Sequence, residues 1–150
     1  MSQDLASLSS PTEVAGALRP VLMKLNRELR RETAAFGVTG GQAALLHIIR
    51  RSPGIGVREL AARERIAPAS MSVAVARLEK AGLVRRTADP LDRRRQALWV
   101  TEQGDRILRT VRTRRTAWLA ARLKRLSPEQ IAAVKAAIEP LSALLEDDVT

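Results

Sequence analysis

The sequence predicts a mainly α-helical fold that contains one small β-hairpin. Three observations predict it: helix-capping motifs occur at three places, apolar residues recur every three or four positions along most of the chain, and the pattern changes to alternation within residues 82–101. The length of 150 residues corresponds to one domain, which we place at residues 1–150. Because the chain has no cysteine, disulfides and thiolate metal sites are excluded.

Helices are predicted near both ends of the chain. Capping motifs begin at Ser10, Thr39 and Ser127, where a hydroxyl accepts the backbone N–H three residues on. One-sided apolar stripes follow the first and the last motif: Leu18, Leu22, Leu25 and Leu29, and then Ile131, Val134, Ile138, Leu141 and Leu145. Such a stripe packs either on the rest of its own chain or on a second chain. Pro20 and Pro140 lie inside these patterns, and we expect each to bend or interrupt its helix.

Between the terminal helices, short elements follow one another closely. Helices are predicted at 42–51, 57–65 and 69–81, and the last has Met71, Val75 and Leu78 on its inward face. Gly82 ends that helix. Strands are predicted at 82–87 and 96–101, with turn residues 89–92 between them, and Thr101 then caps a long helix over 102–126.

The excess of positive over negative charge lies in the middle of the chain. Residues 50–115 hold 17 Lys and Arg and 7 Asp and Glu, a difference equal to the whole net charge of +10. An arginine-rich composition alone should not segregate charge in this way. A polyanion partner, with nucleic acid first, explains the distribution better.

Two short helices joined by a tight turn and followed by a basic hairpin form a helix-turn-helix with a wing. On double-stranded DNA, a helix fits the major groove, and an extended arm fits the minor groove, whose negative potential attracts arginine. The wing carries Arg93, Arg94 and Arg95. We expect Arg94 to enter the minor groove while Asp92 accepts its hydrogen bonds, and we expect the neighbouring arginines to meet phosphates. The alternative is a solvated loop that keeps the hairpin edge from pairing with another strand.

The sequence resembles the MarR family of winged-helix regulators. The resemblance is carried by RLEKAGLV at 77–84, DPLDRR at 89–94 and VTEQG at 100–104, and it extends over nearly the whole chain. It implies a winged helix-turn-helix DNA-binding lobe at about 39–101 and N- and C-terminal dimerisation helices at about 10–36 and 102–148. It also implies a homodimer that reads a palindromic operator, most simply as a repressor.

The resemblance places the recognition helix between Pro68 and Ala81. Where the family often has arginine, this chain has Val73, so base contact would fall on small residues and Arg77 would meet phosphate. The candidate DNA-binding residues are Pro68, Ala69, Ser70, Ser72, Val73, Arg77, Asp92, Arg93, Arg94 and Arg95. The alternative function is an architectural protein that binds DNA through the same fold without a preferred operator.

Few residues suggest other chemistry. His47 is the only histidine, and we expect it to be a buried structural residue. Family members often bind small aromatic or amphipathic effectors, for which His47 and Trp118 are the candidate pocket residues. We expect no metal site, no cofactor and no enzymatic activity, since neither nucleotide-binding glycine spacing nor a catalytic triad can be assigned. The chain has no apolar run of about 20 residues and no leader pattern, so we expect a soluble cytoplasmic protein without a membrane partner.

Overall fold

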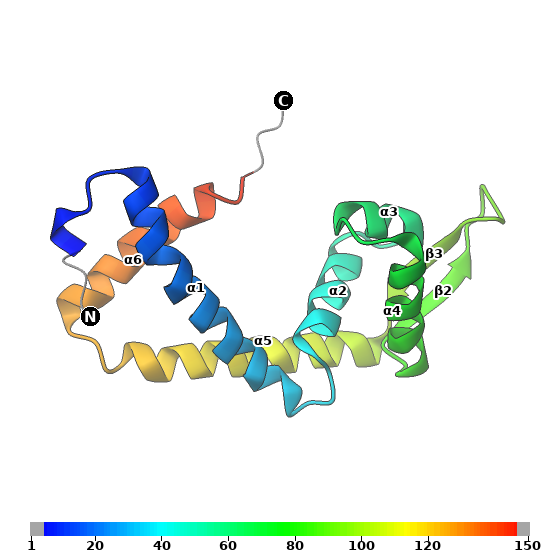
Figure 1. The fold of residues 1–150 in the computed structure, drawn as a ribbon. Coiled ribbons are helices and arrows are strands. Elements are labelled where there is room, and N and C mark those ends of the chain that lie inside the picture. The colour runs from blue at the N-terminus through cyan, green and yellow to red at the C-terminus, as the bar shows by residue number, and fades with distance from the viewer. Residues whose placement is uncertain (1–4, 147–150) are drawn as a thin grey trace. The chain divides into compact units, whose positions relative to one another are not determined.

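The computed structural model describes residues 5–146, which contain six α-helices and a small sheet (Figure 1). A short 3₁₀ helix, η1 (Leu5–Ser7), precedes α1 (Pro11–Ala34) and α2 (Gly40–Arg51). The strand β1 (Ile55–Gly56), α3 (Val57–Arg63), α4 (Pro68–Lys80), β2 (Val84–Ala88) and β3 (Gln96–Val100) follow. The chain continues through α5 (Glu102–Leu123) and α6 (Pro128–Ala143). The predicted fold class, mainly α with a small β wing, is confirmed.

The three predicted capping motifs each start a helix. The hydroxyls of Ser10, Thr39 and Ser127 accept the backbone N–H groups three residues on, at 3.1–3.2 Å, and the side chains there bond back to the caps. Of the two effects expected of proline, interruption does not occur: α1 and α6 continue through Pro20 and Pro140. A proline inside a helix removes one backbone N–H donor, and here this loss does not end either helix.

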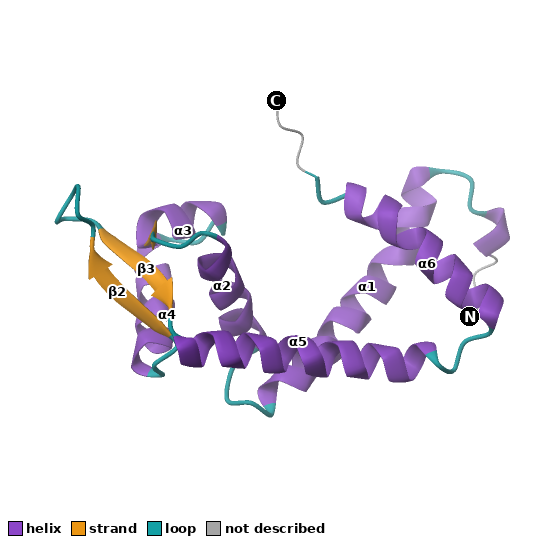
Figure 2. Ribbon diagram, turned by 180° about the vertical axis from the view of Figure 1, so that it is seen from behind, coloured by secondary structure: helices purple, strands orange, loops and turns teal. Residues whose placement is uncertain are grey.

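The sheet has three strands in the order β1-β3-β2, all antiparallel. Thr87 faces Ala97 in the β2–β3 hairpin, which extends beyond the helices in Figure 2. The sequence predicted only this hairpin. β1 was missed because two residues carry no alternation, and it is defined by its pairing of Ile55 with Leu98.

Residues from α2, α3, α4, the sheet and the first half of α5 form the core. Met71, Val75 and Leu78 are fully buried on α4, as predicted, and Leu60 lies against them from α3. These residues fix which face of α4 points to solvent. At the start of α5, Gly104 passes so close to the carbonyl of Leu83 that no side chain fits there.

Several boundaries differ from the prediction by a few residues. α3 ends at Arg63 instead of residue 65, because Arg65 adopts a left-handed conformation with φ +53°. The first hairpin strand starts at Val84, since Gly82 has φ +74° and turns the chain after α4. α5 ends at Leu123, three residues earlier than predicted.

The chain forms two compact units, and the division falls inside α5 between Arg115 and Thr116. The first unit contains α1–α4, the sheet and most of α5. The second contains the end of α5 and α6. The predicted winged lobe, residues 39–101, lies wholly in the first unit.

Candidate nucleic-acid interface

The solvent face of α4 carries the side chains that the sequence predicts to reach DNA. Pro68 is the first helical residue, and Ala69, Ser70, Val73 and Arg77 are exposed, while Ser72 is half-buried. Val73 is 53% exposed, a large fraction for an apolar side chain one turn into a helix. Because Met71, Val75 and Leu78 hold the opposite face in the core, this face is fixed toward solvent.

The start of α4 has no side-chain cap. Its N-cap residue is Ala67, which offers no oxygen to the first-turn N–H groups. Those groups carry the positive end of the helix dipole, and a phosphate oxygen is a suitable acceptor for them. The first turn of α4 therefore combines small side chains with free backbone donors.

The wing loop between β2 and β3 is held by its own aspartates. Asp89 Oδ1 accepts the N–H of Leu91 at 2.9 Å, and Asp92 Oδ1 accepts the N–H of Arg94 at 3.0 Å. The sequence predicts that Asp92 accepts hydrogen bonds from the guanidinium of Arg94. In the structure it bonds to the main chain instead, because a side chain two residues back reaches the backbone N–H of a turn more easily.

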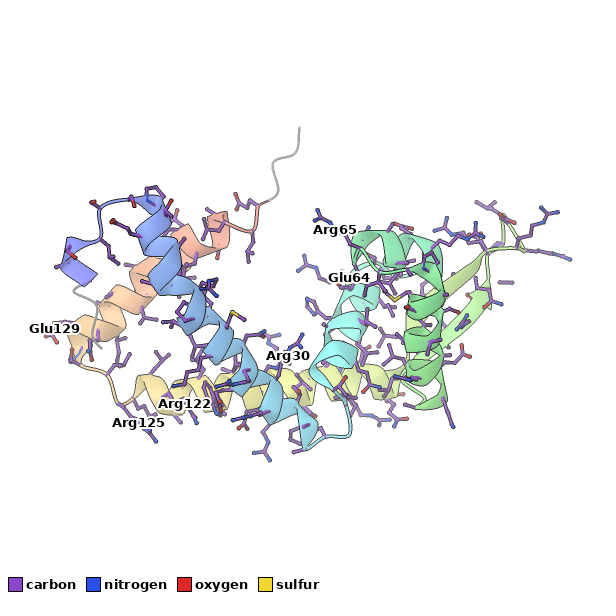
Figure 3. All side chains as sticks on the ribbon, in the orientation of Figure 1. Arg30, Glu64, Arg65, Arg122, Arg125 and Glu129 are labelled. Carbon is purple, nitrogen blue, oxygen red and sulfur yellow. The ribbon has the colours of Figure 1, made fainter. Side chains whose placement is uncertain are left out.

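The three wing arginines differ in their surroundings. Within residues 5–146, the guanidinium groups of Arg93 and Arg94 have no acidic side chain within ion-pair distance. Arg95 Nη2 lies 3.1 Å from Glu59 Oε2, and its Nε lies 3.8 Å from Asp89 Oδ2. Figure 3 shows nitrogen-ended side chains extending from this loop. Two of the three predicted cations are thus free to meet an anion.

A groove of about 980 Å³ lies between the first turn of α4 and the wing. It brings together six of the predicted DNA-binding residues: Pro68, Ala69, Ser72, Asp92, Arg94 and Arg95. Ser70, Val73, Arg77 and Arg93 do not line it. The groove therefore joins the helix and the wing into one surface.

Two charged residues of this groove on α3, Arg58 and Glu59, were not predicted from the sequence. Arg58 is exposed in the first turn of α3, where the first helix of a helix-turn-helix crosses a DNA backbone. That position could have been singled out from the motif. Arg86 also lines the groove, but its Nε bonds to Glu79 Oε2 at 2.9 Å.

The candidate dimerisation residues are largely uncovered in the single chain. Leu22, Leu25, Ile131, Val134, Ile138 and Leu145 are exposed, and Leu18 and Leu141 are half-buried. α6 has no buried residue. In the structure, the chain's own core therefore does not cover these stripes.

Of the two candidate effector residues, His47 lies in surroundings different from those expected. His47 is exposed on α2 instead of buried, because Leu46 and Ile49 occupy the inward face of that helix. The Trp118 ring is covered by Arg122, whose guanidinium carbon lies 3.5 Å from the ring centroid. Neither residue lines the cavity of about 470 Å³ between α1 and the start of α2.

That cavity is strongly basic. Arg27, Arg30 and Arg31 line it from α1 together with Met23, and Arg30 (labelled in Figure 3) packs against Gly40 at the start of α2. Arg115 lies close by, where burial and then the neighbouring Arg30 lower its pKa. Among residues 5–146, no group of His, Cys, Asp and Glu is placed to hold a metal ion.

Comparison with known proteins identifies this arrangement. The MarR family profile matches residues 38–95, the winged lobe. An HTH-type transcriptional regulator of Mycobacterium bovis, Mb0904, is 30% identical over 140 residues, which cover 93% of this chain and 98% of the relative. The chain belongs to the MarR family. A second relative, the transcriptional repressor MdtR of Bacillus subtilis, is 28% identical over 80% of this chain and 77% of its own length.

A solved MarR-type fold overlays nearly the whole chain. A Pseudomonas aeruginosa protein assigned as a transcriptional regulator matches with a TM-score of 0.81 and 28% identity, covering 93% of this chain and all of that one. MarR-family regulators act by binding DNA through a winged helix and not by catalysis, so the chain is a DNA-binding transcription regulator and not an enzyme. None of the helices described is long and apolar enough to cross a membrane.

Proposed function

We propose that the protein is a homodimeric repressor that binds a palindromic operator in the cytoplasm and is released by a small effector. One observation supports binding to a specific operator: the groove between the first turn of α4 and the wing is lined by both elements, and the guanidinium of Arg94 in its lining has no acidic partner in the described chain. A helix and an arm that share one surface can engage adjacent major and minor grooves.

α4 is proposed to read bases in the major groove. Its exposed side chains from Pro68 to Val73 are short, so this part of the helix can approach the base edges closely. The hydroxyls of Ser70 and Ser72 can donate to or accept from bases, and Val73 offers apolar contact to a thymine methyl. Arg77, one turn further on, reaches a phosphate. Pro68 and Ala69 lie at the uncapped helix start, which suits a second phosphate.

The wing is proposed to enter the minor groove. Arg94 is the inserted residue, because it lines the shared groove and its guanidinium is unpaired. Asp92 supports it indirectly by fixing the main chain at Arg94. Arg93 does not line the groove, and its position in the same loop suits a phosphate contact. Sequence preference would come from α4 and from the width of the minor groove.

Dimerisation is proposed to cover the apolar faces of α1 and α6. Large apolar side chains that stay exposed in a monomer mark an interface. Ile138 and Leu145 are 61% and 82% exposed, and Leu18, Leu22, Leu25, Ile131, Val134 and Leu141 complete the two stripes. A dimer would place two copies of α4 about one DNA turn, roughly 34 Å, apart.

An effector could release the dimer by favouring a spacing of the lobes that does not fit DNA. The basic cavity between α1 and α2 suits the binding of a small amphipathic anion, such as an aromatic acid, as the effector, because three arginines line it together with Met23 and Ala34. His47 and Trp118 remain candidates from the family resemblance, although they lie outside this cavity.

Fluorescence anisotropy tests whether the protein prefers a specific operator to random DNA. The protein is titrated against its own upstream intergenic DNA and against random duplex of equal length, near physiological salt. We expect a preference of about 10³-fold or more for the intergenic DNA, with two subunits bound per site. Equal binding to both duplexes, falling steeply with salt, would instead identify an architectural DNA-binding protein.

A further inference from the structure

The side chain of Arg95 crosses from the wing to α3. Its Nη2 donates to Glu59 Oε2 at 3.1 Å, although the two residues are 36 positions apart in sequence. The guanidinium lies over the buried Gly56 of β1, where an added Cβ would meet Nε at 3.1 Å. The main chain of Arg95 also closes the wing loop, since its N–H donates to Asp92 and its carbonyl accepts from Asp89.

Glu59 is the centre of this connection. Its second oxygen, Oε1, accepts from Arg63 Nη2 at 3.4 Å, and Arg63 Nη1 donates to Ser52 Oγ at 2.7 Å. The carboxylate therefore joins the wing to α3 and, through Arg63, to the end of α2. A carboxylate beside a DNA-binding groove repels phosphate unless cations neutralise it, and here two guanidinium groups do so.

We propose that Arg95 and Glu59 form a clamp that positions the wing relative to α3 and α4, so that Arg95 is a positioning residue and not a phosphate ligand. The inference rests on the proposed function, because positioning matters only where helix and wing bind one duplex together. It revises the sequence-based expectation that all the arginines around Arg94 meet phosphates. Arg93, which has no acidic partner in residues 5–146, keeps that role.

The two roles predict opposite effects for Glu59→Gln. If Arg95 were a phosphate ligand, removing the carboxylate would free it and also remove a repulsive charge, and DNA binding would tighten. If the pair is a clamp, the wing loses its position and operator binding weakens. Glu59 and Arg95 side chains are both about half exposed, at 47% and 49%, so the global stability of the fold should change little.

The test compares Glu59→Gln, Arg95→Ala, the double variant and the matched control Arg93→Ala. Anisotropy titrations against the intergenic DNA are run over a range of salt concentrations, and thermal unfolding checks the fold. Each clamp variant should bind about 3- to 20-fold more weakly, as expected for two half-exposed pairs per dimer, with the slope of log K against log[salt] unchanged. The double variant should lose no more than either single variant. Arg93→Ala should reduce the magnitude of the slope by about 1.8 for the two subunits.

Tighter operator binding by Glu59→Gln, or a slope change in Arg95→Ala equal to that of Arg93→Ala, would overturn the clamp. Failure of the proposed function is a separate result, because it appears in the wild type as equal binding to both duplexes. In that case, hydrogen exchange of the backbone amides within residues 89–96 tests whether the Arg95–Glu59 pair positions the wing. Faster exchange in Glu59→Gln at an unchanged unfolding temperature supports the clamp, and equal exchange rejects it.

Discussion

Replacement of Arg94 by alanine should change the affinity for DNA and leave the stability of the fold unchanged. The Arg94 guanidinium has no acidic partner in residues 5–146, and only its backbone N–H is engaged, by Asp92. Alanine keeps that N–H. The substitution therefore removes no ion pair from the free protein, and its unfolding temperature should stay that of the wild type. Any effect must come from the DNA complex.

The expected size follows from the number of wings. One arginine in contact with bases contributes about 1–3 kcal/mol to discrimination, and a dimer on a palindrome inserts two. Arg94→Ala should therefore weaken operator binding by about 2–6 kcal/mol, which is roughly 30-fold or more. Binding to random duplex should fall much less, because phosphate contacts dominate it.

Anisotropy titration against both duplexes measures this difference, with Arg93→Ala as the matched control. The control carries the same charge change one residue away, outside the groove. It should weaken binding to both duplexes alike. If Arg94→Ala leaves the ratio of operator to random affinity unchanged, the wing does not read the minor groove and the mechanism proposed for it is incorrect.

Four further predictions concern the fold and the proposed dimer. Gly104→Ala should destabilise the fold by about 1–3 kcal/mol in chemical denaturation, since its Cβ would overlap the Leu83 carbonyl; an unchanged midpoint would mean that α5 has room to shift. Arg65→Gly should raise stability by up to about 1 kcal/mol because φ is +53° there, whereas the control Arg65→Ala keeps the strain and should not. Ile138→Glu should shift the dimer toward monomer in sedimentation velocity by about 1.5–3 kcal/mol per buried side chain, and the control Lys135→Ala should not; a persistent dimer would move the interface elsewhere. Backbone hydrogen bonds from Ser9 and then Ser10 lower the pKa of Glu13, so its support of the α1 start is fully present above the usual glutamate pKa and lost as pH falls through the lowered value; amide NMR shifts of Ser10 should report this titration, and Glu13→Gln should abolish it.

Local chemistry explains which parts of the fold could be predicted. The capping motifs at Ser10, Thr39 and Ser127 act over three residues, so the sequence contains both partners of each bond. The buried set on α4 repeats with the helical period, and this repeat fixes the exposed face as well. The helices, the hairpin and the exposed face of α4 could therefore all be predicted from residues that lie close together in the sequence.

Long-range pairing explains what was missed. β1 consists of two residues and exists only because Ile55 meets Leu98 from a strand more than 40 positions later. The ion pair of Arg95 was not predicted, because three adjacent arginines look alike in sequence. Its partner, Glu59, lies on another helix, and no local pattern joins the two residues. His47 was expected to be buried because apolar residues flank it, but adjacent helical positions face different directions.

The placement of acidic residues also determines which basic side chains of the segment a polyanion can reach. Residues 50–115 contain 17 basic and 7 acidic side chains, but this net charge does not show which of the basic side chains are unpaired. Five of those acids lie within 4 Å of a cation of this segment: Glu59, Glu79, Asp89, Glu102 and Asp105. None of the described acids pairs with Arg77, Arg93 or Arg94. Three of these acids, Glu59, Glu79 and Asp89, lie on α3, on α4 and at the wing, where they pair with Arg95 and Arg86. Pairing therefore leaves Arg77, Arg93 and Arg94 without an acidic partner on this surface, so the placement of the acids determines which of its side chains a polyanion meets.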